Sequence, residues 1–283
     1  MKNKIIYITG SHGGIGSDLI DLFKEKKITY FESVSDITNR NEISKEIELI
    51  KPDIVIHLAA MVGTKDCEEV PRQAVETNVI GTLNVVEAAK AVGAKFVYFS
   101  TTAIYKPGTN PIKEDSPIGP YTIYGKTKHW GEEIAKTYIP KNDLLIIRPC
   151  FGFGGRTDVS MLGALIRSHY THKYVNLLLA MENLKDYTYV RNITFYVYTL
   201  LEMNAFGNDF NVSQGEARPY LEVIQKLMKK KVFPYFKNFP DLDYMGSHVV
   251  DSSKILKYTG KKPIYSFDQG LDIIIKEYEK NKK

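Results

Sequence analysis

The chain has 283 residues, enough for one large hydrophobic core or for one core and a small additional lobe. Its 43% of apolar and 25% of charged residues are ordinary for a soluble globular protein, and a net charge of +5 with scattered lysines argues against a nucleic-acid surface. Two cysteines without a partner motif, Cys67 and Cys150, argue against a disulfide scaffold and a cysteine-built metal site, and they suit a reducing compartment.

Membrane and export signals are also weak in the sequence. The apolar run near the N-terminus has four residues before a glycine loop begins, which is too short for a signal peptide. No apolar stretch approaches the ~20 residues that span a bilayer. We therefore expect a cytoplasmic protein without a membrane partner.

Strand and helix patterns alternate through the first 150 residues. Short apolar runs predict strands at residues 5–9, 28–32, 53–60, 95–101 and 144–149. Apolar residues at helical spacing predict helices at residues 17–26, 43–51, 75–92 and 121–138. Such alternation is typical of a Rossmann-type, doubly wound α/β fold, in which helices cover both faces of a parallel sheet. We expect residues 1–150 to form a dinucleotide-binding domain.

The rhythm changes after residue 150. Helices are predicted at residues 158–170, 191–204, 217–230 and 267–281, with short strand candidates at 186–190 and 209–213. We expect residues 151–283 to form mostly a smaller, discontinuous lobe that binds substrate, with segments that return to the main sheet.

A glycine-rich loop, TGSHGGIG, follows the first predicted strand and opens the first helix. Gly10 suits the tight turn, Gly13 lets the backbone approach a pyrophosphate, and Gly16 lets helix and strand pack closely. The helix N-terminus adds N–H donors and a positive dipole. This position in the fold favours dinucleotide binding over a plain glycine turn.

The glycine spacing, together with HLAA at 57–60 and ETNVIGTLNVVEAAKAVGAKFVYFST at 76–101, resembles the extended short-chain dehydrogenase/reductases, the NAD-dependent epimerase/dehydratase family. The resemblance covers almost the whole chain and implies a nicotinamide dinucleotide cofactor, NAD or NADP. The residues that it implies at the cofactor are Gly10, His12, Gly13, Gly14, Ile15, Gly16, Glu32, Asp36, Ile37, Leu58, Ala59, Ala60 and Lys128.

The choice between NAD and NADP stays open. In this family an Asp-Ile or Asp-Val dipeptide contacts the adenine, and Asp36-Ile37 matches it. Glu32 at the end of the second predicted strand would favour NAD through the ribose hydroxyls. His12 and Arg40 would instead favour the 2′-phosphate of NADP.

Tyr124 and Lys128 have the Tyr-x-x-x-Lys spacing of the family's catalytic pair, but Tyr258 and Tyr278 also have a lysine four residues on. Residues four apart on a helix share one face, so Lys128 can stabilise a Tyr124 phenolate and lower its pKa. A stop signal after Tyr258 indicates that its helix ends before Lys262, and Tyr278 follows no Ser or Thr strand end.

The resemblance assigns a role to each member of the predicted catalytic group. Thr101, at a strand end, would hold the reacting oxygen, while Tyr124 would give its proton and Lys128 would also hold the nicotinamide ribose. Asn78 matches a position that supports the active-site backbone and a water. Tyr105 is interpreted as a packing or substrate-wall residue.

The later segments resemble the branch of the family that modifies nucleotide sugars. Lys185 before DYTYV takes the place of an arginine that binds the diphosphate, and Phe151 replaces an asparagine in RPCFGFGG. Arg156 is a candidate for a compensating cation. The residues expected at the substrate are Thr101, Thr102, Tyr124, Phe151, Arg156 and Lys185.

Absent residues narrow the reaction type. Thr102-Ala103 stands where 4,6-dehydratases carry Asp-Glu, and Ala103 stands where GDP-fucose synthase carries an epimerising cysteine. With the short segment before Asp36, the chain is similar to the dTDP-4-dehydrorhamnose reductases. The resemblance thus implies reduction of a 4-keto nucleotide sugar, with a 4-epimerase that retains NAD as the second choice and a cofactor-binding regulatory subunit as a third. Family members often form homodimers, and we expect one here.

Overall fold

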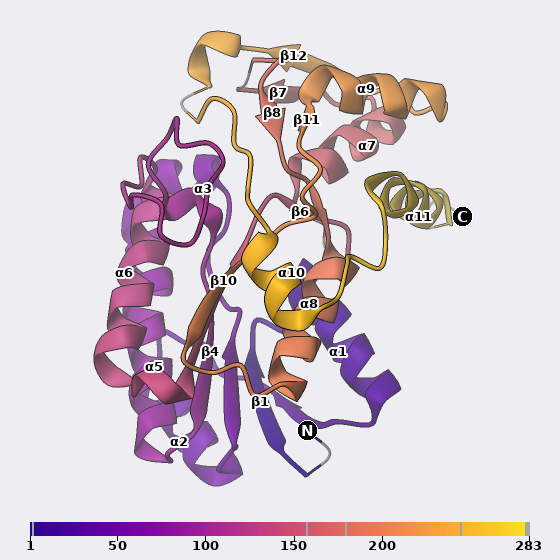
Figure 1. The fold of residues 1–283 in the computed structure, drawn as a ribbon. Coiled ribbons are helices and arrows are strands. Elements are labelled where there is room, and N and C mark those ends of the chain that lie inside the picture. The colour runs from indigo at the N-terminus through magenta and orange to yellow at the C-terminus, as the bar shows by residue number, and fades with distance from the viewer. Residues whose placement is uncertain (2, 157, 179, 244, 281–283) are drawn as a thin grey trace.

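A six-stranded parallel sheet lies at the centre of the molecule (Figure 1). The computed structural model describes residues 1, 3–156, 158–178, 180–243 and 245–280. Across the sheet the strands are β10 (Asn208–Val212), β5 (Leu144–Pro149), β4 (Lys95–Phe99), β3 (Ile54–His57), β1 (Ile5–Thr9) and β2 (Thr29–Glu32). Every neighbouring pair is parallel. The predicted α/β fold is confirmed, and all the carboxyl ends of the strands meet at one edge.

Alternating side chains give the sheet two buried faces. On β1, Tyr7 packs in one core cluster, whereas Ile6 and Ile8 pack in another. The helices on the Tyr7 face are α2 (Arg40–Ile50), α5 (Thr82–Ala91) and α6 (Ile123–Tyr138), and those on the opposite face are α1 (Gly14–Lys26) and α8 (Val190–Glu202). Because both faces are covered, the four inner strands are largely apolar and buried, whereas the edge strands β2 and β10 carry polar residues.

A second core cluster lies beyond the carboxyl edge of the sheet. Its helices are α7 (Met161–Thr171), α9 (Tyr220–Lys229) and α11 (Phe267–Lys280). The short strands around it pair as β6 (Gly152–Phe153) with β9 (Thr188–Tyr189), β7 (Val175–Leu177) with β12 (Phe236–Asn238), and β8 (Leu184–Lys185) with β11 (Arg218–Pro219). The candidate strand at 209–213 is β10 of the main sheet. The division into domains at residue 150 stays a prediction.

Several predicted elements differ from those observed. In place of the single helix expected at 75–92, the structure has three helical segments in succession. They are α4 (Pro71–Val75), a π-helical turn η1 (Glu76–Gly81) and α5. The side-chain amide of Asn78, within this π turn, hydrogen-bonds the backbone of Met61 in the loop after β3. The strand expected at 53–60 ends at His57, because the next residues pack against Gly10. Helix α10 (Ser253–Thr259) is the helix expected to end after Tyr258. The remaining elements, which the patterns missed, are α3 (Thr64–Glu69), η2 (Thr102–Ile104), η3 (Lys141–Asp143) and η4 (Pro240–Leu242).

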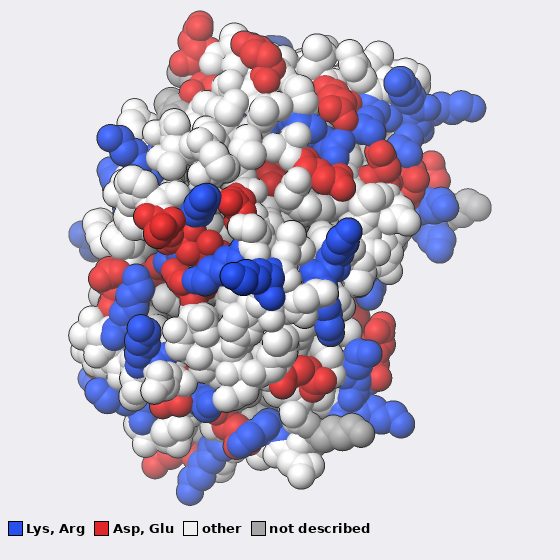
Figure 2. Space-filling view, viewed as in Figure 1, with Lys and Arg blue, Asp and Glu red and all other residues white. Residues whose placement is uncertain are grey.

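Charged side chains of both signs are interspersed on the face drawn in Figure 2. Basic side chains stand there beside acidic ones. None of the helices within the described residues is both long and apolar enough to cross a membrane.

A buried ion pair joins helix α6 to strand β5. Arg148 donates from Nε and Nη2 to the two carboxylate oxygens of Glu132, at 2.8 and 2.9 Å. The side chains of Arg148 and Glu132 are 3% and 0% exposed, so water does not solvate their charges. Each charge is stabilised by the other instead. Burial favours the neutral acid, but the Arg148 guanidinium overcomes it and holds the pKa of Glu132 below its usual range.

We predict that Arg148→Met lowers the free energy of unfolding by about 3–5 kcal/mol, because it leaves the Glu132 carboxylate buried without its cation. Chemical denaturation measures this change. The matched control is Lys136→Met. Lys136 also pairs with Glu132, at 3.4 Å, but its side chain is 43% exposed. We therefore expect this change to lower the free energy of unfolding by less than about 1 kcal/mol. Equal losses in the two variants would contradict the prediction.

Candidate functional site

A cleft of about 2100 Å³ lies along the carboxyl edge of the sheet, between the main sheet and the second core. Strand order reverses at this edge between β1 and β3, which is where open α/β sheets bind ligands. The predicted site residues that line the cleft are Gly10, Gly13, Gly14, Ile15, Gly16, Asp36, Ile37, Leu58, Ala59, Ala60, Thr101, Thr102, Tyr124, Lys128, Phe151 and Lys185. The predicted cofactor, catalytic and substrate residues therefore meet largely in one place.

The glycine loop has the geometry that a pyrophosphate needs. Gly10 has a φ of +74°, and a Cβ there would lie 2.5 Å from the backbone nitrogen of Ala59. A Cβ on Gly16 would lie 2.2 Å from the Gly10 carbonyl oxygen, whereas one on Gly13 would meet that oxygen at 3.4 Å and otherwise open space. No side chain caps the N-terminus of α1 at Gly13, so its first N–H groups are available to an anion in the cleft.

The adenosine end of the predicted cofactor site differs in detail from the expectation. Glu32 is the last residue of β2, but it is not among the described residues that line the cleft, and neither is His12. Ser33, Ser35 and Asp36 line it instead. The Asp36 carboxylate accepts hydrogen bonds from the backbone N–H and hydroxyl of Thr38, and these lower its pKa. Arg40 pairs with Glu87 at 3.0 Å.

Thr101, Tyr124 and Lys128 come together where β4 ends and α6 begins. Thr122 caps α6 by accepting from Gly125 N–H at 3.1 Å, which fixes Tyr124 in the first turn. The hydroxyl of Thr101 lies close enough to Tyr124 to influence its pKa, and it accepts from the N–H of Ala103 at 3.1 Å. Lys128 is one turn further along the helix and 2% exposed, with its Nζ 4.5 Å from the centre of the Tyr98 ring.

The pKa of Tyr124 differs from the prediction. Burial raises it to about 12, and the neighbouring Thr101 hydroxyl only partly offsets that rise. Burial also lowers the pKa of Lys128 to about 7, against the attraction of Glu132, so part of the lysine population is neutral at pH 7. The expected lowering of the tyrosine pKa is therefore wrong for this structure: desolvation raises the pKa by more than Thr101 lowers it, and the phenol stays protonated.

Asn78 supports the backbone of the cleft rather than lining it. It is 0% exposed, accepts from Met61 N–H at 2.7 Å and donates to Thr127 Oγ1 at 3.0 Å. Thr127 in turn donates to the carbonyl oxygen of Tyr124. Asn78 thus connects the loop after β3 to the turn of α6 that carries the tyrosine.

On the substrate side, the predicted cation already has partners. Lys185 is 4% exposed, and its Nζ lies 3.3 Å from the Asp243 carboxylate and donates to the Gly246 carbonyl oxygen. Asp243 also accepts from Asn183 Nδ2 at 2.8 Å and lines the cleft. Arg156 is not among the described residues of the cleft, and its guanidinium pairs with Asp21 on α1. The predicted compensating role of Arg156 has no support in this arrangement.

Other residues of the site had no sequence signal. Asp243 lies in an irregular segment without a motif. His248, 4% exposed, places its Nε2 3.0 Å from Thr102 Oγ1, and its ring is edge-on to Phe151 at 5.4 Å. Tyr187, which lines the cleft, also contacts Phe151, at 6.2 Å between ring centres. Sequence reasoning brought Tyr187 near the substrate only because the DYTYV segment directly follows Lys185.

The rival pair of Tyr258 and Lys262 lies elsewhere, as predicted, whereas Lys282, the partner of Tyr278, lies outside the described residues. Helix α10 ends at Thr259 with Gly260 in the left-handed conformation, so Tyr258 and Lys262 do not share a helix. Tyr105, which we interpreted as packing or substrate wall, is 2% exposed and donates its hydroxyl proton to Asn211.

Comparison with known families agrees with this geometry. The model of the NAD dependent epimerase/dehydratase family matches residues 6–213. The chain is 28% identical over 267 residues to a UDP-glucuronate 4-epimerase of Thermodesulfobacterium geofontis, covering 89% of this chain and 80% of the relative. It is 26% identical over 294 residues to a GDP-6-deoxy-D-talose 4-dehydrogenase of Aggregatibacter actinomycetemcomitans, covering 98% and 97% of the two chains.

A solved structure supports the fold. The crystal structure of a dTDP-4-dehydrorhamnose reductase from Clostridium acetobutylicum superimposes with a TM-score of 0.82 over 97% of this chain and 99% of that one. Sequence identity is 22%, so the likeness concerns the fold. The expected NAD or NADP is confirmed at the level of the family, and the choice between the two stays open.

We predict that Gly13→Ala and Gly16→Ala fail in different ways. The Gly13 methyl meets open space, so the variant should keep its stability but raise the dissociation constant for NADH and NADPH by about tenfold or more, because the methyl occupies the approach of the pyrophosphate. The Gly16 methyl meets backbone and should destabilise the protein. Thermal unfolding and fluorescence titration separate the effects, and unchanged cofactor affinity in Gly13→Ala would contradict the assignment.

Proposed function

This chain belongs to the NAD dependent epimerase/dehydratase family, and from that premise we propose that it is an NAD(P)H-dependent reductase of a 4-keto nucleotide sugar. One observation carries the choice of a reductase. Tyr124 lines the cleft, and burial raises the pKa of its phenol to about 12, so the phenol is protonated at neutral pH. A protonated phenol suits a group that gives a proton to a developing alkoxide.

The residues fit the cofactor, and each has a task. Gly13 and the N-terminus of α1 would hold the pyrophosphate, and Asp36 the adenosine end. The bound dihydronicotinamide would supply a hydride, and thus two electrons, to the carbonyl carbon. Tyr124 donates its hydroxyl proton to the carbonyl oxygen, which Thr101 orients by hydrogen bonding. The charged form of Lys128 stabilises the resulting phenolate until solvent returns the proton.

The substrate class rests on the relatives and on the cleft. The two relatives described above act, by their names, on UDP-glucuronate and on a GDP-deoxysugar at C4. Thr102-Ala103 supplies no carboxylic acid or thiol beside Thr101, which disfavours dehydration and thiol-dependent epimerisation. The epimerase relative keeps a 4-epimerase with retained NAD as the second candidate.

We predict that Tyr124→Phe lowers kcat by about 10²–10⁴-fold, the usual worth of a positioned proton donor, while cofactor affinity is unchanged. The assay follows nicotinamide absorbance with a panel of 4-keto sugar nucleotides and both NADH and NADPH. Tyr258→Phe, in the rival pair outside the described cleft, is the matched control and should leave kcat unchanged.

The same panel separates the candidate functions. A reductase oxidises one NADH or NADPH for each sugar reduced, whereas an epimerase interconverts two nucleotide sugars without net change in cofactor. No oxidation of either cofactor with any keto sugar would contradict the reductase, and full turnover in Tyr124→Phe would contradict its proton donor.

We further predict opposite effects from Lys185 and its partner. Lys185→Met should raise the KM for the nucleotide sugar by about tenfold, because the diphosphate loses a buried cation. Asp243→Asn keeps the size of the side chain and one acceptor oxygen but removes the negative charge that holds Lys185, so it should lower that KM. Steady-state kinetics at saturating cofactor measure both. Changes in the same direction would contradict competition between Asp243 and the diphosphate for Lys185.

A further inference from the structure

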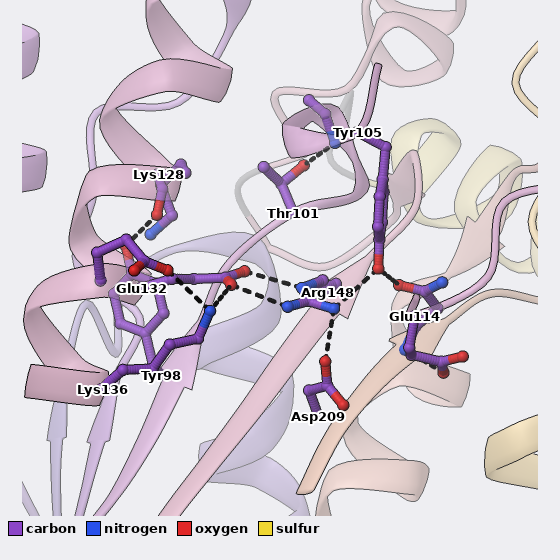
Figure 3. Close-up of polar contacts among 12 residues, drawn as sticks. Tyr98, Thr101, Tyr105, Glu114, Lys128, Glu132, Lys136, Arg148 and Asp209 are labelled. Atoms are coloured by element: carbon purple, nitrogen blue, oxygen red, sulfur yellow. Dashed lines mark hydrogen bonds and ion pairs between the residues drawn. The ribbon is translucent and has the colours of Figure 1, made fainter. Parts of the chain in front are cut away.

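Strand β5 carries a guanidinium that contacts several parts of the site at once. Besides its two bonds to Glu132 on α6, Arg148 donates from Nη1 to the Tyr105 hydroxyl and to the Asp209 carboxylate of β10, each at 2.8 Å (Figure 3). Tyr105 lies four residues after Thr101. Its hydroxyl donates a hydrogen bond to Asn211 of β10. One buried side chain therefore connects the Thr101 segment, helix α6 and the edge of the sheet.

Glu132 also lies at a defined place relative to the predicted catalytic residues. Tyr124, Lys128 and Glu132 follow one another at four-residue intervals on α6, so they lie along one face of the helix. Figure 3 shows Glu132 beside Lys128 and turned toward Arg148. Because Arg148 takes both carboxylate oxygens, the position of the negative charge is fixed.

We infer that the Arg148–Glu132 pair positions the predicted catalytic group: it fixes α6 to the Thr101 segment and places a permanent negative charge one turn from the Lys128 ammonium. Glu132 and Arg148 are positioning residues, since they act through Lys128, Tyr105 and the helix rather than on a ligand. The expected effect of the ion pair on turnover rests on the proposed function. The expected effect of Glu132 on the charge of Lys128 is independent of any substrate.

The other neighbours of Lys128 do not supply that charge. The titratable groups that face it besides Glu132 are Tyr98 of β4, His57 of β3, Cys67 of α3 and Tyr124 of α6. Burial lowers the pKa of His57 to about 3, raises that of Cys67 to about 11 and raises that of Tyr98 as well. Among these described groups, Glu132 is the one that is charged at pH 7.

The test follows Lys128 directly. The full-length protein, labelled with ¹³C at lysine Cε, is titrated by NMR, and the Lys128 signal is identified by its loss in Lys128→Arg. Glu132→Gln removes the negative charge, so the Lys128 midpoint should fall from near pH 7 by about one unit or more. Glu133→Gln, the same change at an exposed neighbour on the same helix, should leave it unmoved.

A second variant guards against loss of folding. Glu132→Gln combined with Arg148→Met removes both ions, so no unpaired charge stays buried, and the Lys128 midpoint should again fall. A midpoint equal to wild type in a folded Glu132 variant would overturn the inference. The titration needs no substrate, so its result can be interpreted even if the reductase assay fails.

Kinetics test the geometric half. Tyr105→Phe keeps the ion pair but removes the hydroxyl that joins Arg148 to the Thr101 segment. We expect kcat to fall about tenfold while the Lys128 midpoint and the KM for cofactor stay unchanged. In Glu132→Gln the basic limb of the pH profile of kcat/KM should move with the NMR midpoint. An unchanged kcat in Tyr105→Phe would overturn the connection to Thr101.

Discussion

All six central strands run in the same direction, and the site follows from that constraint. Parallel strands bring their carboxyl ends to one edge, so Gly10 after β1, Ala59 after β3, Thr101 after β4 and Phe151 after β5 border the same cleft. Helix α6 must cross back over the sheet to connect β4 to β5, and its first turn therefore begins beside Thr101. The catalytic candidates are close in space because of topology, not because of sequence proximity.

Burial then decides the chemistry that these residues can perform. The sheet and α6 remove Tyr124 and Lys128 from water, which favours the neutral form of each group. A neutral phenol is a proton donor, and a lysine with a pKa of about 7 responds to charges nearby. The buried Glu132 carboxylate is such a charge, and Arg148 keeps it ionised. The ion pair that joins α6 to β5 is thus also part of the electrostatic environment of the site.

The sequence allowed prediction of the elements and residues that local rules govern. Apolar periodicity predicted the central strands and flanking helices, and the spacing of Gly10, Gly13 and Gly16 predicted a loop whose geometry depends on missing Cβ atoms. The π turn at Asn78 was not predicted, because the helical periodicity of this segment does not distinguish a π turn from an α-helix, and the contact of Asn78 with Met61, 17 residues earlier, has no local signal. The pKa of Tyr124 was predicted in the wrong direction, since a spacing of four residues identifies a cationic neighbour but not the burial of both groups.

Prediction from the sequence is more limited still in the half of the cleft where the substrate is expected to bind. Resemblance identified Lys185 as a phosphate-binding cation, and the structure places it in the cleft, but 58 residues along the chain Asp243 supplies a carboxylate to it. A ligand phosphate there must compete with a partner that is already bound and already desolvated, so Lys185 contributes only the difference between the two interactions. Phe151, which stands where the family has an amide, presents its ring to His248 and Tyr187. This half of the cleft therefore presents aromatic rings and an already paired cation rather than an unpaired positive charge.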